Sequence, residues 1–455
     1  MKTLKLTFHG GAGMVTGSNF LLEGNSTKLL VDCGLVQGCK ICEDINREPF
    51  PYDPKSIQVL IITHAHLDHI GRVPRLVREG FTGIIYSTPS TKEIAEAMLT
   101  DSIGVLTKEA ERDGKEPIYT SEDVSKTFAL WKEVDYHKDV DINKEFTLFL
   151  KDAGHILGSA IVELTHISSG KKIVFTGDLG NSPAPFLRDT ERISDADYVI
   201  MESVYGNRDH EDVETRTRLL EKIIEDTVSR KGALMIPAFS IERTQVLLYE
   251  MNKLVEDGRI PRIPIFLDSP LAIEVTHIYK NYIKNFKKDI QDEHSIDDIF
   301  NFPGLKFTKS SAESRSIVET PNPKVIIAGS GMSNGGRIVF HEKRYLSDPD
   351  STLLLVGYQA AGSLGRQIAD GAKEVTILNE KVPVKAHIEK ISGYSAHRDS
   401  TGLIEFIDNT SGTVTQVFVA MGEPKSSLHL VQRLRDYLGI SAVAPEKGQS
   451  FDLEV

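Results

Sequence analysis

Cysteine is scarce in this 455-residue chain, which contains only Cys33, Cys39 and Cys42. Three cysteines cannot build the disulfide framework on which small secreted folds depend. Cys39 and Cys42 have the spacing of zinc ligands, but no second pair completes a four-cysteine site. We therefore expect all three thiols to be reduced.

Long apolar runs are also missing. No stretch approaches the roughly 18–20 apolar residues that a membrane-spanning helix requires. The first 17 residues, MKTLKLTFHGGAGMVTG, alternate as a strand does and lack the apolar core of a secretory signal. These absences favour a cytoplasmic protein without a membrane partner.

An excess of positive charge is the third absence. The chain has 53 Lys and Arg against 65 Asp and Glu, a formal net charge of −12. This balance argues against a surface that binds nucleic acid indiscriminately. It does not exclude a nuclease, because a local groove can be positive and a bound divalent cation changes the field around it.

What is present is the pattern of a large α/β protein. The first two hundred residues contain short strand-like runs, such as 28–32, 58–63 and 171–177, and helix-like stretches at 91–110 and 121–132. After Gly206, strands and helices alternate, which predicts a doubly wound parallel sheet. From about residue 383 the strands shorten again, so the middle zone can be an insertion into an interrupted first domain.

One short segment concentrates metal-ligand side chains. ITHAHLDHIG, residues 62–71, follows an apolar strand and contains His64, His66, Asp68 and His69. His64 and His66 are two residues apart, so both face one side of an extended segment. Imidazole and carboxylate together suit zinc or a similar divalent cation.

Other candidate ligands lie at the ends of other strands. Asp32 ends the strand KLLVD, His155 lies in the glycine-flanked segment DAGHILGSA, and Asp178 follows the strand KIVFT. Each one alone is equally compatible with a turn or cap residue. Together with the H-x-H-x-D-H segment, in this order, they predict one active site assembled from strand ends.

The order of these residues resembles the successive motifs of the metallo-β-lactamase fold, an αββα sandwich whose site usually holds two zinc ions. The resemblance implies that His64, His66 and His155 hold the first metal and that Asp178 bridges both. In that superfamily a hydroxide between the metals is the nucleophile, and its pKa is lowered by metal binding.

The second metal site departs from the pattern. The resemblance assigns it Asp68, His69 and the bridging Asp178, with Asp32 orienting a ligand through a hydrogen bond. RNA-acting relatives usually add a histidine from a V-H-G-E motif, and this chain has Met421 at that place. A thioether is a poor zinc ligand beside carboxylates, so the second site is expected to be weaker.

Further segments resemble the β-CASP nucleases, a branch that carries an insert domain and acts on nucleic acid. MESVYGNRDH (201–210) supplies Glu202, and SGYSAHRD (392–399) supplies His397. By this resemblance His397 assists the leaving oxygen and Glu202 orients it. Segments similar to the insert are IPAFSIERTQVLL (236–248), AGSGMSNGGR (328–337) and GYQAAGSLGR (357–366).

The insert motifs also contain candidate substrate contacts. The glycine-rich segment 328–337 has the character of a phosphate nest but lacks the ending of a P-loop. Arginines beside these motifs are candidate contacts to backbone phosphates, although arginine is also an ordinary surface residue. The candidate substrate-binding residues are Arg243, Ser330, Arg337, Arg366 and Ser395.

The sequence therefore predicts a metallo-β-lactamase domain in two segments, 1–206 and 381–455, interrupted by a doubly wound α/β β-CASP insert at 207–380, with the substrate cleft between the two domains. The expected activity is zinc-dependent hydrolysis of RNA phosphodiester bonds, endo- or exonucleolytic. A DNA-directed nuclease of the same branch and a non-catalytic RNA-binding subunit remain alternatives. The sequence leaves the oligomeric state open.

Overall fold

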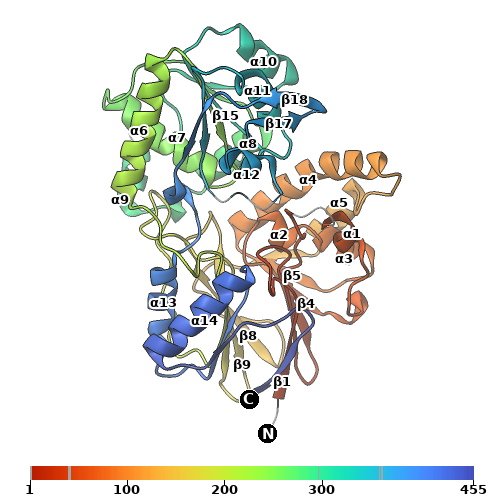
Figure 1. The fold of residues 1–455 in the computed structure, drawn as a ribbon. Helices are drawn as coiled ribbons and strands as arrows, with labels where there is room; N and C mark the ends of the chain where they lie inside the picture. Colours follow the sequence, from red (N-terminus) through yellow and green to blue (C-terminus); the bar gives the residue numbers. More distant parts are fainter. Residues whose placement is uncertain (1–2, 39–41, 296, 358, 360–361) are drawn as a thin grey trace. The chain divides into compact units, whose positions relative to one another are not determined.

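The computed structural model describes residues 3–38, 42–295, 297–357, 359 and 362–455. Its residues form two compact units. Unit 1 comprises the chain up to Asp209 together with His397–Val455, and unit 2 comprises His210–Ala396 (Figure 1). Within the described ranges, no helix has both the length and the apolar character needed to cross a bilayer.

Unit 1 contains two seven-stranded sheets. The first has the order β22 (Ser450–Glu454), β1 (Thr3–Gly10), β2 (Asn19–Glu23), β3 (Lys28–Val31), β4 (Val59–Ile61), β5 (Ile84–Ser87) and β6 (Trp131–Glu133). The second has the order β21 (Ala442–Val443), β20 (Gln416–Val419), β11 (Tyr198–Met201), β10 (Lys172–Phe175), β9 (Ala160–His166), β8 (Phe146–Asp152) and β7 (Val140–Asp141).

Aromatic side chains join the two sheets face to face. Phe8 of β1 lies 5.6 Å from Phe418 of β20 between ring centroids, and Phe20 of β2 lies 6.1 Å from Phe175 of β10. These rings belong to one buried apolar cluster drawn from both sheets. Because both inner faces are apolar, packing them together removes them from water and forms the core of unit 1.

Helices cover the outer faces of the two sheets. A second apolar cluster packs α13 and α14 against the outer face of the second sheet, and α2–α5 lie beside the first sheet (Figure 1). The helices of unit 1 are α1 (Cys42–Arg47), α2 (Leu67–Ile70), α3 (Val73–Arg78), α4 (Pro89–Arg112), α5 (Ser121–Ala129), α13 (Ser400–Asp408) and α14 (Pro424–Leu438). The expected αββα sandwich is confirmed.

Unit 2 contains a parallel sheet flanked by helices. Its strand order is β14 (Leu305–Phe307), β13 (Ile265–Leu267), β15 (Lys324–Ala328), β12 (Ala233–Pro237), β16 (Thr352–Leu355) and β19 (His387–Lys390). A hairpin of β17 (Glu374–Ile377) and β18 (Glu380–Pro383) accompanies it. The helices are α6 (Val213–Ser229), α7 (Arg243–Glu256), α8 (Pro270–Asn281), α9 (Lys288–His294), α10 (Ser311–Ser316), α11 (Ile338–Tyr345) and α12 (Leu364–Ala369). The predicted strand–helix alternation is confirmed.

Two local expectations were wrong. The helix expected over 121–132 ends at Ala129, and Trp131 begins β6, which pairs with β5. The Trp131 indole donates to Ser87 Oγ at 2.8 Å, so tertiary pairing outweighs the local helical pattern. The second wrong expectation is that all thiols are reduced. Cys33 is free and buried, but Cys42 is disulfide-bonded. Cys39 lies outside the described residues.

Candidate metal centre

Parallel strands of unit 1 deliver the candidate ligands to one place. Asp32 follows β3, and the segment carrying His64 and His66 follows β4. Asp178 follows β10 in the second sheet, and Glu202 follows β11 directly. The carboxyl ends of these strands thus bring together side chains that are far apart in the sequence.

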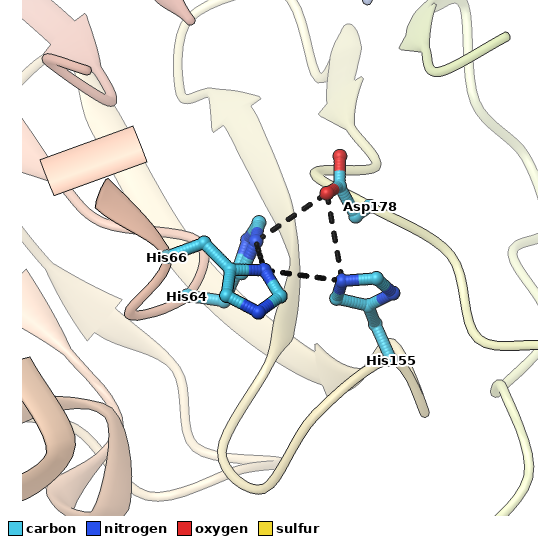
Figure 2. Close-up of side chains that lie close together, drawn as sticks. All are labelled: His64, His66, His155 and Asp178. Atoms are coloured by element: carbon cyan, nitrogen blue, oxygen red, sulfur yellow. Dashed lines mark hydrogen bonds and ion pairs between the residues drawn. The ribbon is translucent and has the colours of Figure 1, made fainter. Parts of the chain in front are cut away.

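Three histidines and one carboxylate form a compact cluster (Figure 2). His66 Nδ1 lies 3.0 Å from His64 Nε2 and 3.3 Å from His155 Nε2. Asp178 Oδ2 lies 3.4 Å from His64 Nε2 and 3.5 Å from His155 Nε2. All four ligand atoms lie within 4.8 Å of one another.

The protonation states suit cation binding. Burial lowers the pKa of His64, and burial lowers the pKa of His66 and His155 well below 6.5, so these imidazoles are neutral near pH 7. Burial alone would raise the pKa of Asp178, but the neighbouring His69, His397 and His64 hold it well below its usual value. The cluster therefore offers three nitrogen lone pairs and one ionised carboxylate.

The spacing of these donor atoms matches a tetrahedral zinc site. Zinc–nitrogen bonds of about 2.0–2.1 Å place neighbouring tetrahedral ligands roughly 3.3 Å apart. The four separations given above, 3.0, 3.3, 3.4 and 3.5 Å, fall around that value. Nitrogen lone pairs directed at one another at such distances repel unless a cation lies between them, so histidines that all present lone pairs to this point fit a bound metal.

Thr63 and Asp32 orient His64 and His69 through contacts at their Nδ1 atoms. Asp32 is fully buried and accepts hydrogen bonds from Thr63 N at 2.9 Å and from the Thr63 hydroxyl at 2.9 Å. The same hydroxyl lies 3.0 Å from His64 Nδ1. Because its proton is given to Asp32, it accepts from His64 Nδ1–H and leaves Nε2 of His64 free to bind a metal. Sequence reasoning missed Thr63, whose only signal was its position directly before His64.

Asp68 and His69 lie beside this cluster on α2. Among the described residues, neither belongs to the groups whose ligand atoms converge within 4.8 Å. His69 Nδ1 contacts Asp32 Oδ2 at 2.7 Å, and its Nε2 lies 3.5 Å from Asp178 Oδ1. Burial raises the pKa of Asp68, whereas the nearby His69 lowers it. Their assignment to a second metal stays a prediction.

Asp178 also belongs to a second group, with Glu202 and His397. His397 Nδ1 lies 3.2 Å from both carboxylate oxygens of Glu202 and 3.8 Å from Asp178 Oδ2. Burial would lower the pKa of His397, but the carboxylates of Glu202 and Asp178 raise it to about 9. The fully buried Glu202 is held in place by the Leu179 N–H, which donates to it at 2.7 Å.

Met421 is part of the core rather than of the ligand set. It follows β20, is 1% exposed and packs in the apolar cluster between the sheets. Its sulfur lies 3.7 Å from Ser18 Oγ, and that hydroxyl lies 3.4 Å from Asp32 Oδ2. Met421 is therefore separated from Asp32 by one hydroxyl group.

Unit 2 holds the five candidate substrate residues, and their roles stay predictions. Arg337 donates to the buried Asp268 at 2.7 Å and to the carbonyls of Thr308 and Lys309, so its guanidinium is engaged within the fold. The other four are Arg243, buried at the start of α7; Ser330, in the loop after β15; Arg366, exposed and paired with Asp370; and Ser395, buried. Of the motif 357–366, residues 358, 360 and 361 lie outside the described ranges.

Comparison with protein families divides the chain into three matched regions. A metallo-β-lactamase superfamily domain matches residues 21–202, and a Beta-Casp domain matches residues 244–368. A Zn-dependent metallo-hydrolase RNA specificity domain matches residues 381–445. These matches accord with metal binding by the cluster around His64.

Curated relatives match nearly the whole chain. Ribonuclease TTHA0252 of Thermus thermophilus is 35% identical over 429 residues, which cover 94% of this chain and 95% of that protein. Transcription termination factor FttA of Methanosarcina mazei is 32% identical, covering 97% of this chain and 70% of that protein. A crystal structure of a protein of unknown function from Enterococcus faecalis V583 shares the fold, with a TM-score of 0.57 and 13% identity over 99% of this chain and 100% of that one. The chain belongs to the β-CASP family of metallo-β-lactamase-fold nucleases.

Proposed function

We propose that this chain is a ribonuclease that hydrolyses phosphodiester bonds of single-stranded RNA in the cytoplasm, during RNA processing or decay. The observation that carries the proposal is the cluster of His64, His66, His155 and Asp178, whose donor spacing fits zinc. The matched RNA specificity domain and the relative named as a ribonuclease support RNA as the substrate.

Two zinc ions are proposed for each chain. His64, His66 and His155 would hold the first ion, Asp68 and His69 would hold the second, and Asp178 would be shared by both. When bound, the metals lower the pKa of water, supply a nucleophile near neutral pH and neutralise charge on the phosphate. Asp32 fixes His69 through the 2.7 Å contact at Nδ1, which leaves Nε2 directed towards Asp178.

His397 is the proposed proton donor to the leaving oxygen. Its Nδ1 faces the Glu202 carboxylate, so Nε2, on the opposite side of the ring, carries the proton that is transferred. The Glu202 charge stabilises the imidazolium before transfer, which keeps the acid form available at neutral pH. Glu202 acts through His397 and is a positioning residue.

Substrate phosphates are proposed to contact residues of the insert. Arg243, Ser330, Arg366 and Ser395 remain the proposed contacts. Arg337 is proposed to contribute through the loop that it anchors to Asp268, since this ion pair occupies its guanidinium.

A DNA-directed nuclease is the second candidate, and Met421 favours it. A histidine is expected at this place in RNA-acting relatives, and here a thioether packs in the core instead. Loss of that ligand leaves an open position at the proposed second metal site without removing the first site.

The experiment compares cleavage of matched 5′-labelled single-stranded RNA and DNA by the zinc-supplemented full chain. His64→Ala removes one ligand of the cluster. His429→Ala is the matched control, because His429 is an exposed histidine of α14 in the same unit. A chelated sample reports the metal requirement.

We expect the wild-type chain and His429→Ala to cleave RNA. Cleavage should be lost when chelator is added and in His64→Ala. Preferential cleavage of DNA would move the assignment to the second candidate. Metal-loaded protein that binds RNA and cuts neither polymer would overturn the proposal in favour of a non-catalytic RNA-binding subunit.

A further inference from the structure

The parallel sheet of unit 2 has a change of winding direction between two neighbouring strands. After β12 the chain continues to β13, which lies towards the β14 edge of the sheet. After β15 it continues to β16, which lies towards the opposite edge, formed by β19. β12 and β15 are adjacent and parallel. In open α/β sheets, ligands bind at such a point, outside the carboxyl ends of the strands. Here the loops at that point are 238–242 and 329–337.

An exposed aromatic residue lies at this edge. Phe239 follows β12 and is 39% exposed, although most large apolar side chains of the unit are buried. One edge of its ring lies against Gly331: a Cβ at that position would come within 2.7 Å of Phe239 Cδ2. Gly331 therefore leaves the space that the ring occupies, and any larger residue would displace it.

The loop of Phe239 is fixed by α7. Thr244 Oγ1 donates to the Phe239 carbonyl at 2.8 Å, and the buried Gln245 donates from Nε2 to the Ser240 carbonyl at 3.1 Å. The Tyr279 hydroxyl donates to the Glu242 carboxylate at 2.8 Å. The aromatic ring is thus presented on a braced backbone rather than on a free loop.

The facing loop is fixed from two sides. Gln359 Nε2 donates to the Gly331 carbonyl at 3.0 Å, and the Gly365 N–H donates to the Met332 carbonyl at 3.1 Å. Below the loop, the Ser333 hydroxyl donates to the fully buried Glu342 of α11. Binding at this edge consequently requires little ordering of the backbone, which favours affinity.

Two hydroxyl groups lie at the start of the loop that faces Phe239. A Cβ at Gly329 would make ordinary van der Waals contacts with the Ala238 carbonyl and Ser269 Oγ, both at 3.8 Å, and with Ser240 Oγ at 4.0 Å. Hydroxyl groups at Gly329, two residues before the glycine against which the aromatic ring lies, suit a nucleotide, because the base can stack on the ring while its edges and sugar form hydrogen bonds nearby.

We propose that loops 238–242 and 329–337 form a nucleotide subsite in which Phe239 stacks on a base of single-stranded RNA. The identity of the polymer rests on the proposed function; the stacking itself rests on the geometry of this edge. Every base has an aromatic face, so the subsite tolerates any sequence. Phe239 precedes the region matched by the Beta-Casp domain and has no other assigned role.

The test measures binding of fluorescent 12-nucleotide RNA by anisotropy, with the zinc-supplemented full chain in a His64→Ala background that prevents cutting. Phe239→Leu keeps apolar bulk but removes the ring, and Phe239→Tyr restores it. Phe340→Leu is the matched control, because Phe340 is also exposed but lies on α11, outside the two loops. An RNA of the same length without bases measures the contribution of the backbone alone.

Phe239→Leu is expected to weaken RNA binding by about 5- to 150-fold, the range of one base–aromatic stack, with recovery in Phe239→Tyr. It should leave binding of the abasic strand unchanged, and Phe340→Leu should leave both unchanged. Equal binding by Phe239→Leu and its parent, or equal losses on normal and abasic strands, would overturn the subsite. Base-dependent binding through Phe239 without RNA cleavage by the His64-containing chain would instead overturn the ribonuclease and leave the subsite standing.

Discussion

Glu342 makes the stability of unit 2 depend on pH. Its carboxyl group is fully buried in α11 beneath the loop 329–337. One oxygen accepts the Ser333 hydroxyl, and the other is buried without a hydrogen-bond partner among the described residues. Burial of this group raises its pKa from 4.5 to about 8, so the folded protein holds the neutral acid at pH 7.

The folded state binds the carboxyl proton of Glu342 more tightly than the unfolded state does, so protonation of this group stabilises the fold. The stabilising contribution is complete below pH 4.5 and is lost as the pH rises through about 8. In between, the free energy of unfolding falls by about 1.4 kcal/mol per pH unit, or about 5 kcal/mol in all. Glu342→Gln is neutral throughout and loses this dependence, although its extra buried N–H groups cost about 1–3 kcal/mol at low pH.

Hydrogen–deuterium exchange of peptides covering α11 is the appropriate assay. The single tryptophan, Trp131, belongs to unit 1 and does not report on this helix. Comparing the wild type with Glu342→Gln at each pH cancels the intrinsic pH dependence of exchange. Protection of α11 in the wild type, relative to the variant, should decline steadily between pH 5 and 8. If the ratio of α11 protection between wild type and Glu342→Gln stayed constant across this pH range, the reasoning would be refuted.

Three further predictions concern the metal centre and the insert. Glu202→Gln should move the basic limb of the pH–rate profile for RNA cleavage to lower pH, because burial then lowers the pKa of His397 without the opposing Glu202 charge; an unmoved limb would contradict the assigned proton donor. Met421→His should increase zinc per chain measured by elemental analysis, while Met421→Leu should not, since only the imidazole adds a ligand; equal zinc in the two variants would count against an open ligand position there. Asp268→Asn should lower the free energy of unfolding by about 3 kcal/mol in urea titrations, because it leaves the charge of Arg337 uncompensated; a loss below about 1 kcal/mol would show that solvent replaces the carboxylate.

The sequence located the candidate ligands because their signal is local. His64 and His66 are two residues apart behind an apolar strand, and Asp178 directly follows another strand. The hydrogen bonds that orient these ligands are not local. Asp32 contacts Thr63, 31 residues later, and His69, 37 residues later. Contacts of this kind depend on strand pairing, which residue patterns do not specify.

The insert was harder to predict for the same reason. Its predicted extent, 207–380, stays a proposal, and β19 pairs in parallel with β16 of the six-stranded sheet. The sequence of a four-residue strand does not indicate which sheet the strand joins. Arg337 had the character of a free phosphate contact in the sequence, but its partner Asp268 lies 69 residues earlier. Pairing across such distances becomes visible only in the fold.

The pairing of β1 with β22 has a consequence for protein synthesis. The strand nearest the start of the chain, Thr3–Gly10, takes its outer partner from Ser450–Glu454. His397 joins Asp178 and Glu202 from the same late segment. A ribosome must therefore translate through Ser450–Glu454 before β1 gains this outer partner, and through His397 before the proposed acid can reach the cluster. Until those residues have been made, a growing chain is expected to lack both the outer partner of β1 and His397, and therefore to be unable to cut RNA.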